Sequence, residues 1–243
     1  MEFQGKVVVI TGASTGLGLG MAEWFHGNGA LVGMCARRTP ADLGTGSVVK
    51  SVDVTDLAAL GAFAEEVGEK LGPIDLWINN AAALGPITPQ RDLPIEELED
   101  HFRVNVGGVL FGTQAYLAQL EKSGHQGSLV NISSGLGKRG MAGVSAYSAA
   151  KAAVDRLTET VGLEEPDLLR MVLAVSPGIV ETGMQEALRS QDASVLHDVE
   201  MFRDKKTDNE MNSPAWVAQA IAGWVFGDVD PGGVLVRVEQ EPH

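Results

Sequence analysis

Two side chains that could exchange a proton stand four residues apart in the stretch from Ser134 to Lys151. Tyr147 and Lys151 belong to an alanine-rich run with high helix propensity, so both project from one helix face. A free tyrosine has a pKa of about 10 and is a poor acid–base catalyst at neutral pH, but a neighbouring ammonium group favours the phenolate. We therefore predict that Lys151 lowers the pKa of Tyr147 toward the working range.

A hydroxyl group precedes this pair at Ser134, where an apolar, strand-like run at 129–133 ends. The hydroxyl could hold a substrate oxygen beside the Tyr147 phenol. The alternative is a chance tyrosine–lysine pair on a solvated helix face. The other motifs of the chain decide between these two interpretations.

A glycine-rich turn, TGASTGLG at 11–18, follows the first predicted strand and leads into a helix that extends to about Asn28. Its glycines let the backbone turn tightly and approach a pyrophosphate, whose charge then faces the helix N-terminus. A strand, a turn and a helix in this order predict a dinucleotide site. The turn residues expected to bind the cofactor are Gly12, Ser14, Thr15, Gly16, Leu17 and Gly18.

The second predicted strand ends without the acidic residue that commonly binds ribose hydroxyls in dinucleotide sites. Ala36 stands at this position and is followed by Arg37 and Arg38. Two guanidinium groups without a carboxylate suit a 2′-phosphate, which predicts NADPH/NADP+ as the cofactor. The alternative is a pair of ordinary surface arginines. The connection at 39–47 is too short for a full helix.

Strands and helices alternate along the whole chain. The expected strands are 6–11, 30–36, 48–54, 74–79, 127–133, 170–176 and 232–239, and one helix is expected over 95–122. This alternation predicts an α/β fold of the Rossmann type, a doubly wound, mostly parallel seven-stranded sheet with helices on both faces. We expect a single domain over 1–243, in which the polar stretch at about 183–212 is a mobile helical flap that covers the substrate.

Composition narrows the possible functions. A net charge of −14 and a pI near 4.7 argue against nucleic acid and anionic membranes as partners. The single cysteine, Cys35, excludes an internal disulfide and fits a reducing cytoplasm. The five histidines lack ligand spacing, so we expect no metal, and no apolar run reaches transmembrane length.

Together these motifs resemble the short-chain dehydrogenase/reductase family over essentially the whole chain. The resemblance rests on the glycine turn, Asn79-Asn80-Ala81, Asn105, Ser134, the Tyr147–Lys151 pair and Pro177-Gly178-xxx-Thr182. Within the family, the segments 163–166 and 182–185 resemble the sepiapterin and benzil reductase branch. One departure is Ala82, which replaces the usual glycine of the NNAG motif.

The resemblance implies a role for each catalytic residue. Tyr147 donates a proton to the carbonyl oxygen as nicotinamide hydride reaches the carbon, and Ser134 orients that oxygen. Lys151 lowers the tyrosine pKa and binds the nicotinamide ribose, and Asn105 positions water for a proton relay. Homodimers or homotetramers are implied as well. The further cofactor-binding residues implied are Asp53, Val54, Asn79, Ala81, Tyr147, Lys151, Pro177, Gly178, Ile179 and Thr182.

We therefore predict an NADPH-dependent reductase that converts a small-molecule ketone or diketone into a secondary alcohol. One alternative is an alcohol or steroid dehydrogenase of the same family that runs oxidatively. Another is a binding protein that senses NADP(H) without turnover, against which the intact Ser134, Tyr147 and Lys151 argue.

Apolar residues flank the catalytic groups in the sequence and predict a pocket for uncharged, apolar ketones. In sepiapterin reductases a carboxylate near the last strand anchors the pterin, and our alignment places Val236 there, which favours benzil-like diketones over pterins. The residues expected to bind substrate are Leu84, Ser134, Leu136, Met141, Val144, Tyr147, Met184 and Leu188.

Overall fold

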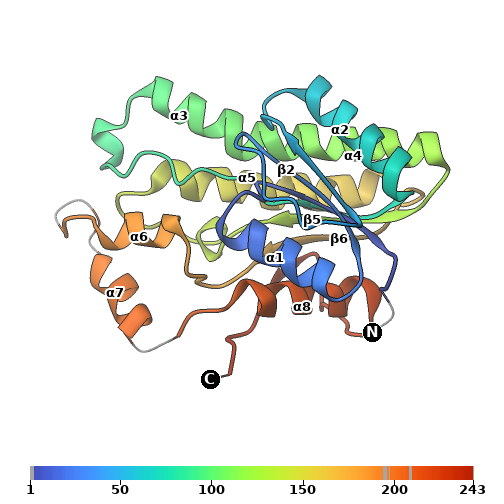
Figure 1. Cartoon of the computed structure of the whole chain (residues 1–243). Coiled ribbons are helices and arrows are strands. Elements are labelled where there is room, and N and C mark those ends of the chain that lie inside the picture. The colour runs from blue at the N-terminus through green and yellow to red at the C-terminus, as the bar shows by residue number, and fades with distance from the viewer. Residues whose placement is uncertain (1–2, 194–195, 197, 208–209, 243) are drawn as a thin grey trace.

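In the part of the chain that the computed structural model describes, residues 3–193, 196, 198–207 and 210–242, seven strands form one sheet (Figure 1). Their order is β3-β2-β1-β4-β5-β6-β7, and each pair of neighbours is parallel. The strands are β1 (Val7–Thr11), β2 (Leu31–Ala36), β3 (Ser47–Ser51), β4 (Ile74–Asn79), β5 (Gly127–Ile132), β6 (Leu169–Ser176) and β7 (Leu235–Arg237).

Helices cover both faces of this sheet, with α1 and α8 on one face and α2, α4 and α5 on the other (Figure 1). The predicted Rossmann-type fold is therefore confirmed. The α-helices are α1 (Gly16–Gly27), α2 (Leu57–Leu71), α3 (Ile95–Phe102), α4 (Gly108–Ser123), α5 (Ser145–Glu164), α6 (Gly183–Arg189), α7 (Val199–Thr207) and α8 (Pro214–Phe226). None of the helices in the described residues combines the length and the apolar character needed to span a membrane.

The central strands are buried on both faces because each face packs against helices. All five residues of β1, VVVIT, are buried, as expected for a parallel strand between two helical layers. One apolar core includes Phe25 of α1 and Ile221 of α8, and the other includes Trp77, whose ring stacks on Tyr116 with 5.7 Å between centroids. These two cores fix the carboxyl edge of the sheet, where the predicted site residues lie.

Two strands differ from the sequence-based prediction by more than one residue at an end. The third strand ends at Ser51, so Asp53 and Val54 lie in the turn that leads to α2. The last strand covers only Leu235–Arg237, because β6 pairs with it only through its final residues, 174–176. As predicted, the connection between β2 and β3 contains no helix.

The helix predicted over 95–122 is interrupted by a π-helical turn, η2 (Arg103–Gly107), between α3 and α4. The Asn105 side chain donates from Nδ2 to the His101 carbonyl oxygen at 3.0 Å. In a regular α-helix this carbonyl would accept from the Asn105 backbone. A side chain that competes for the i−4 carbonyl disturbs the helical ladder, which accounts for the interruption.

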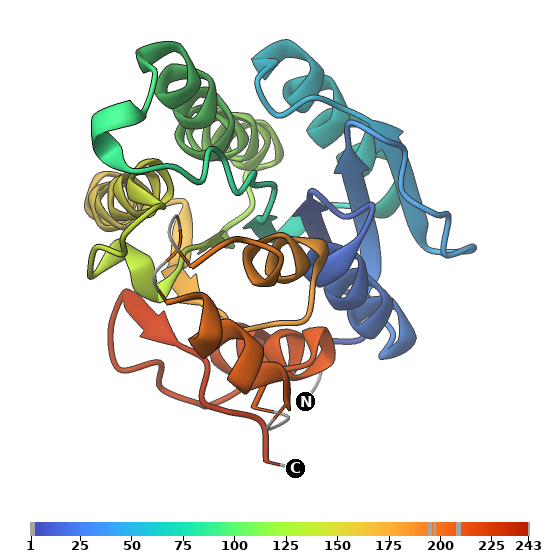
Figure 2. The same cartoon turned by 90° about the vertical axis from the view of Figure 1, so that its left-hand side faces the viewer.

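The segment 183–212 carries α6 and α7, which stand at one end of the sheet (Figures 1 and 2). Residues 194–195, 197 and 208–209 of the predicted flap lie outside the described residues. A small apolar cluster joins these helices to the loop before α5; its buried members are Val144, Leu188, Leu196, Val199 and Phe202. We call 183–207 the α6–α7 segment.

Candidate active site

A cleft of about 1330 Å³ runs along the carboxyl ends of the strands and is bordered by the α6–α7 segment. We call the part beside residues 11–18, 36–38 and 52–54 the glycine-turn end, and the part beside 134–151, α6, α7 and Arg237 the tyrosine end. Every predicted site residue lines this cleft except Asn79 and Asn105. The volume exceeds the upper range of about 1,000 Å³ for single-ligand pockets, which leaves room for a dinucleotide and a substrate.

The glycine-turn end is built by close backbone packing. Gly12 has a φ of +67°, and a Cβ atom there would lie 2.6 Å from the Cα of Ala81. The Thr11 hydroxyl oxygen accepts hydrogen bonds from the backbone N–H groups of Asn80 and Ala81 at 3.0 and 3.1 Å. A side chain at Gly18 would collide with the Asn80 amide. Only glycine therefore fits at positions 12 and 18.

This end of the cleft fits a dinucleotide phosphate. The first turn of α1 contains no acidic residue, and the side chain of its N-cap, Thr15, makes no capping hydrogen bond. The first backbone N–H groups of a helix have no intrahelical partner, and together with the helix dipole they favour an anion. The N-terminus of α1 can therefore hold an anion such as a pyrophosphate.

Arg37 and Arg38 follow β2 at the glycine-turn end and are exposed to solvent. Asp53 lies nearby, and hydrogen bonds from Thr55 lower the pKa of its carboxyl group, with a smaller contribution from Arg37. The Asp53 carboxylate is therefore ionised at neutral pH. Neither arginine forms an ion pair within the described residues.

Ser134, Tyr147 and Lys151 meet at the tyrosine end, where β5 gives way to η3 (Gly135–Gly137) and α5 begins. The Lys151 ammonium lies 5.6 Å from the centroid of the Tyr147 ring. Its Nζ atom donates a hydrogen bond to the Ile132 carbonyl oxygen at 2.8 Å. The Ser134 side chain caps η3 by accepting from the Leu136 N–H at 3.2 Å. Three of the four predicted catalytic side chains are therefore brought together.

The predicted effect of Lys151 on the tyrosine is not found in this structure. Burial raises the pKa of Tyr147, and the hydrogen bond with Ser134 opposes this rise. Lys151 makes no comparable contribution, since its ammonium lies against the ring and is bonded to Ile132. Tyr147 thus keeps its proton at neutral pH and is in the form that can donate it.

Lys151 is itself perturbed, because its ammonium is fully buried. Burial lowers the pKa of Lys151 to about 8, and the Asp155 carboxylate acts in the opposite direction. Asp155 is buried one helical turn further along α5, and the Ser133 hydroxyl donates to it at 2.5 Å. The sequence-based prediction missed Asp155, although a lysine and an aspartate four residues apart on a helix are a recognisable pair.

Asn105 lies behind the cleft rather than in its wall. Its side chain is buried, and its Oδ1 atom accepts from the Ala83 N–H at 3.2 Å. The ring of His101, also buried, lies beside it, 6.2 Å from the Tyr147 ring between centroids. Burial and the Lys151 charge both lower the pKa of His101. The prediction missed His101, because a lone histidine in a helix gives no signal of its contacts.

The structure also corrects Asn79, which was expected in the cofactor site. Its side chain is buried in the sheet, where Oδ1 accepts from the Trp77 Nε1–H at 2.8 Å and Nδ2 donates to Asn131 at 2.9 Å. Successive side chains of a strand point to opposite faces. The neighbouring residue, Asn80, lines the cleft instead.

Val236 is corrected for the same reason. It is packed in the core between the sheet and the helices α1 and α8, whereas the next residue, Arg237, lines the cleft. The predicted apolar residues all line the tyrosine end, but the basic residues beside them were missed. The missed basic residues of the cleft are Lys138, Arg139, Lys205 and Arg237.

Comparison with known proteins identifies the class that this fold and site define. The family model for short chain dehydrogenase matches residues 6–193, so the chain belongs to that family. Its members bind nicotinamide cofactors and act on small molecules, which makes the chain an oxidoreductase of the alcohol–carbonyl type.

Particular relatives show how far the similarity extends. Sorbitol dehydrogenase of Cereibacter sphaeroides is 36% identical over 190 residues, which cover 74% of this chain and 73% of that protein. Benzil reductase ((S)-benzoin forming) of Bacillus subtilis is 29% identical over 222 residues, 88% of this chain and 90% of that protein. A solved actinorhodin polyketide ketoreductase with NADPH has a TM-score of 0.80 at 28% identity, covering 96% of this chain and 95% of that one.

Proposed function

We propose that this protein is an NADPH-dependent carbonyl reductase that converts a ketone or diketone into a secondary alcohol. The observation that carries the proposal is a half-buried, protonated phenol, Tyr147, beside Ser134 and Lys151 in the cleft that also contains the glycine turn. A phenol that keeps its proton at neutral pH is in the form that a general acid needs to protonate a carbonyl oxygen, which is the reductive direction.

Each side chain has a separate task in this proposal. Tyr147 gives its proton to the carbonyl oxygen, and the Ser134 hydroxyl orients this oxygen by a hydrogen bond. The buried Lys151 ammonium stabilises negative charge that develops there and holds the nicotinamide ribose. The nicotinamide, when bound, supplies the hydride. Asn105 positions the loop at Ala83, and through it the wall of the cleft.

Two features support NADPH as the cofactor. Arg37 and Arg38 lack ion-pair partners among the described residues and stand where the adenosine ribose of a dinucleotide is expected. The related polyketide ketoreductase was solved with NADPH. We further propose a homodimer or homotetramer, in line with the family, and a cytoplasmic location, in line with the free and buried Cys35.

The similarity to sorbitol dehydrogenase supports a second candidate, the oxidation of a polyol. Most predicted substrate-binding side chains at the tyrosine end are apolar, whereas a polyol needs a hydrogen-bond partner for each buried hydroxyl group. Apolar ketones therefore suit this lining better than polyols.

The proposal is tested by measuring NADPH oxidation with a panel of α-diketones, aryl ketones, pterins and steroids, and NADP+ reduction with sorbitol and other polyols. Ketone or diketone reduction with the highest kcat/KM supports the proposal. A higher kcat/KM for polyol oxidation contradicts it and favours the second candidate.

A further inference from the structure

The basic residues of this chain are distributed in an unusual way. There are 18 lysines and arginines against 32 acidic residues. Within the described residues, 11 of the 18 form an ion pair with a carboxylate. The seven that form none are Arg37, Arg38, Arg91, Lys138, Arg139, Lys151 and Arg237.

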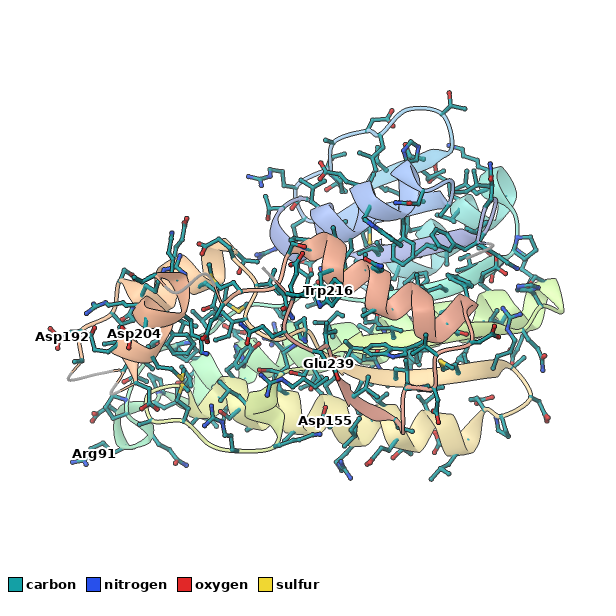
Figure 3. All side chains as sticks on the ribbon, turned by 90° about the horizontal axis from the view of Figure 1, so that it is seen from below. Arg91, Asp155, Asp192, Asp204, Trp216 and Glu239 are labelled. Carbon is teal, nitrogen blue, oxygen red and sulfur yellow. The ribbon has the colours of Figure 1, made fainter. Side chains whose placement is uncertain are left out.

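Six of these seven unpaired residues line the cleft, and the seventh, Arg91, lies at the outer edge of the molecule (Figure 3). Acidic side chains that could pair with them are abundant in a chain of net charge −14. A cleft lined by one sign of charge attracts ligands of the opposite sign. The cleft is thus arranged for anions, although the protein as a whole is acidic.

The unpaired basic residues of the cleft include two groups that lie too far apart for one phosphate group to bind both. Arg37 and Arg38 follow β2, whereas Arg237 belongs to β7, opposite Ser176 of β6. Five strand spacings separate β2 from β7 in the sheet, and at about 4.8 Å each they amount to about 24 Å. The cofactor 2′-phosphate therefore accounts for Arg37 and Arg38 but leaves the other group without a ligand.

The second group consists of Lys138, Arg139 and Arg237 and lies at the tyrosine end. Lys138 and Arg139 directly follow η3, which is pressed against α5: a Cβ atom on Gly137 would lie 2.7 Å from the Asp155 carboxylate and 3.1 Å from the Lys151 carbonyl oxygen. These two basic residues are therefore held close to the catalytic helix.

The backbone around Arg237 is held on both sides, and the side chain is exposed to the cleft. Its backbone is in register with Ser176, at the end of β6, and two residues later the Glu239 carbonyl oxygen accepts from Trp216 Nε1–H at 3.0 Å (Figure 3). By contrast, Lys205 also lines the cleft but pairs with Glu210. Among the described residues that line the cleft, the only acidic one is Asp53, which lies at the glycine-turn end.

We propose that the substrate of this reductase is a ketone that also carries an anionic group, a carboxylate or a phosphate. Arg237, with Lys138 and Arg139, binds the anion, while the apolar residues of the tyrosine end cover the rest of the molecule. Arginine pairs with both anions through two parallel hydrogen bonds. This inference rests on the proposed function and replaces the expectation of an uncharged substrate.

The test compares each acid with a neutral counterpart that has the same reacting carbonyl. We would measure kcat/KM with saturating NADPH for β-benzoylpropionate and γ-benzoylbutyrate against their methyl esters, and for dihydroxyacetone phosphate against dihydroxyacetone. We expect at least one anion to exceed its neutral counterpart by about tenfold or more. The series that responds identifies carboxylate or phosphate as the anion.

Substitutions then locate the anion site. Arg237→Gln should lower kcat/KM for the preferred anion by about tenfold to a hundredfold and leave the neutral counterpart within about twofold. The double variant Lys138→Gln/Arg139→Gln should have a smaller effect of the same kind. Arg91→Gln, at the unpaired arginine outside the cleft, is the matched control and should change neither value. NADP+ affinity should be the same in all these variants.

A binding measurement separates failure of this inference from failure of the proposed function. Calorimetry with the NADP+-loaded protein compares γ-phenylbutyrate with its amide and requires no turnover. Tighter binding of the acid that is lost in Arg237→Gln supports the anion site even if no ketone is reduced. The inference is overturned if neutral counterparts match their anions throughout, or if Arg237→Gln weakens acid and neutral partner equally.

Discussion

At the glycine-turn end the cleft is made mainly of backbone from two loops, whereas at the tyrosine end side chains from many separate segments form it. Gly12 and Gly18 pack directly against 80–81, and Thr11 bonds the same loop. The tyrosine end combines side chains from the loop after β4, from η3, α5, α6 and α7, and from β7.

Because of this difference, substitutions have different consequences at the two ends of the cleft. A backbone cradle is tied to the sheet and binds what all dinucleotides share, so substitutions there remove binding altogether. A lining of side chains can be altered one residue at a time, so selectivity for a substrate is adjusted at the tyrosine end. The exception at the glycine-turn end is the pair Arg37 and Arg38, whose side chains, in the function proposed above, bind the part of the cofactor that differs between NADPH and NADH.

The largest expected effect is the loss of the proton donor. Tyr147→Phe should lower kcat by about a hundredfold to ten-thousandfold, because proton transfer by a positioned group contributes factors of this size. NADPH affinity should stay within about threefold, since cofactor binding depends mainly on the glycine-turn end. Steady-state kinetics and fluorescence titration measure the two effects separately.

Tyr116→Phe is the matched control, because the chain has only two tyrosines. The Tyr116 hydroxyl donates to the Ile74 carbonyl oxygen at 3.1 Å, far from the cleft lining, so this variant should lose some stability and keep its turnover rate. Turnover of Tyr147→Phe within a fewfold of the parent would contradict the assignment of the proton donor.

The next effect concerns the cofactor. Arg37→Glu should remove or invert a preference for NADPH over NADH of about tenfold to a hundredfold, since a charge-assisted contact is worth about 1.5–3 kcal/mol. The ratio of kcat/KM for the two cofactors measures this preference. Arg91→Glu makes the same charge change outside the cleft and should leave the ratio as it is. Equal efficiency with both cofactors in the parent protein would rule the prediction out.

The same comparison explains what could be predicted from the sequence. The position of the glycine turn, Arg37 and Ser134 at the cleft could be predicted, because local order along the chain decides it: a strand, a turn and the start of a helix. Arg237 was missed and Val236 was chosen in its place because an error of one residue in a strand exchanges the two faces. The π-helical turn at Asn105 and the buried neighbours His101 and Asp155 depend on contacts between segments, which no local pattern records.

A third prediction concerns the charge of Lys151. With its pKa lowered to about 8, the free protein loses the buried ammonium above that pH, and kcat/KM for NADPH should fall by about tenfold per pH unit. Asp155→Asn removes the carboxylate that raises the Lys151 pKa. The break in the plot of kcat/KM against pH, where kcat/KM begins to fall, should therefore move to lower pH. A break that stays at the same pH in Asp155→Asn would show that another group produces it.

The smallest expected effect is on the free energy of unfolding, and it tests how tightly the tyrosine end is packed. Burial and Lys151 lower the pKa of His101 below its unfolded value of about 6.5, so the unfolded chain binds more protons than the folded one as the pH falls below that value. This contribution to stability is complete above about pH 6.5 and is lost as the pH falls from there toward the folded pKa.

Urea unfolding at a series of pH values should therefore show a smaller acid-side loss of stability in His101→Gln than in the parent. His26→Gln, on α1 at the opposite face of the sheet, is the control for the general effect of replacing a histidine by glutamine. The same slope in His101→Gln as in the parent would mean that His101 can take up its proton in place, and that this end of the cleft opens to water more easily than its packing indicates.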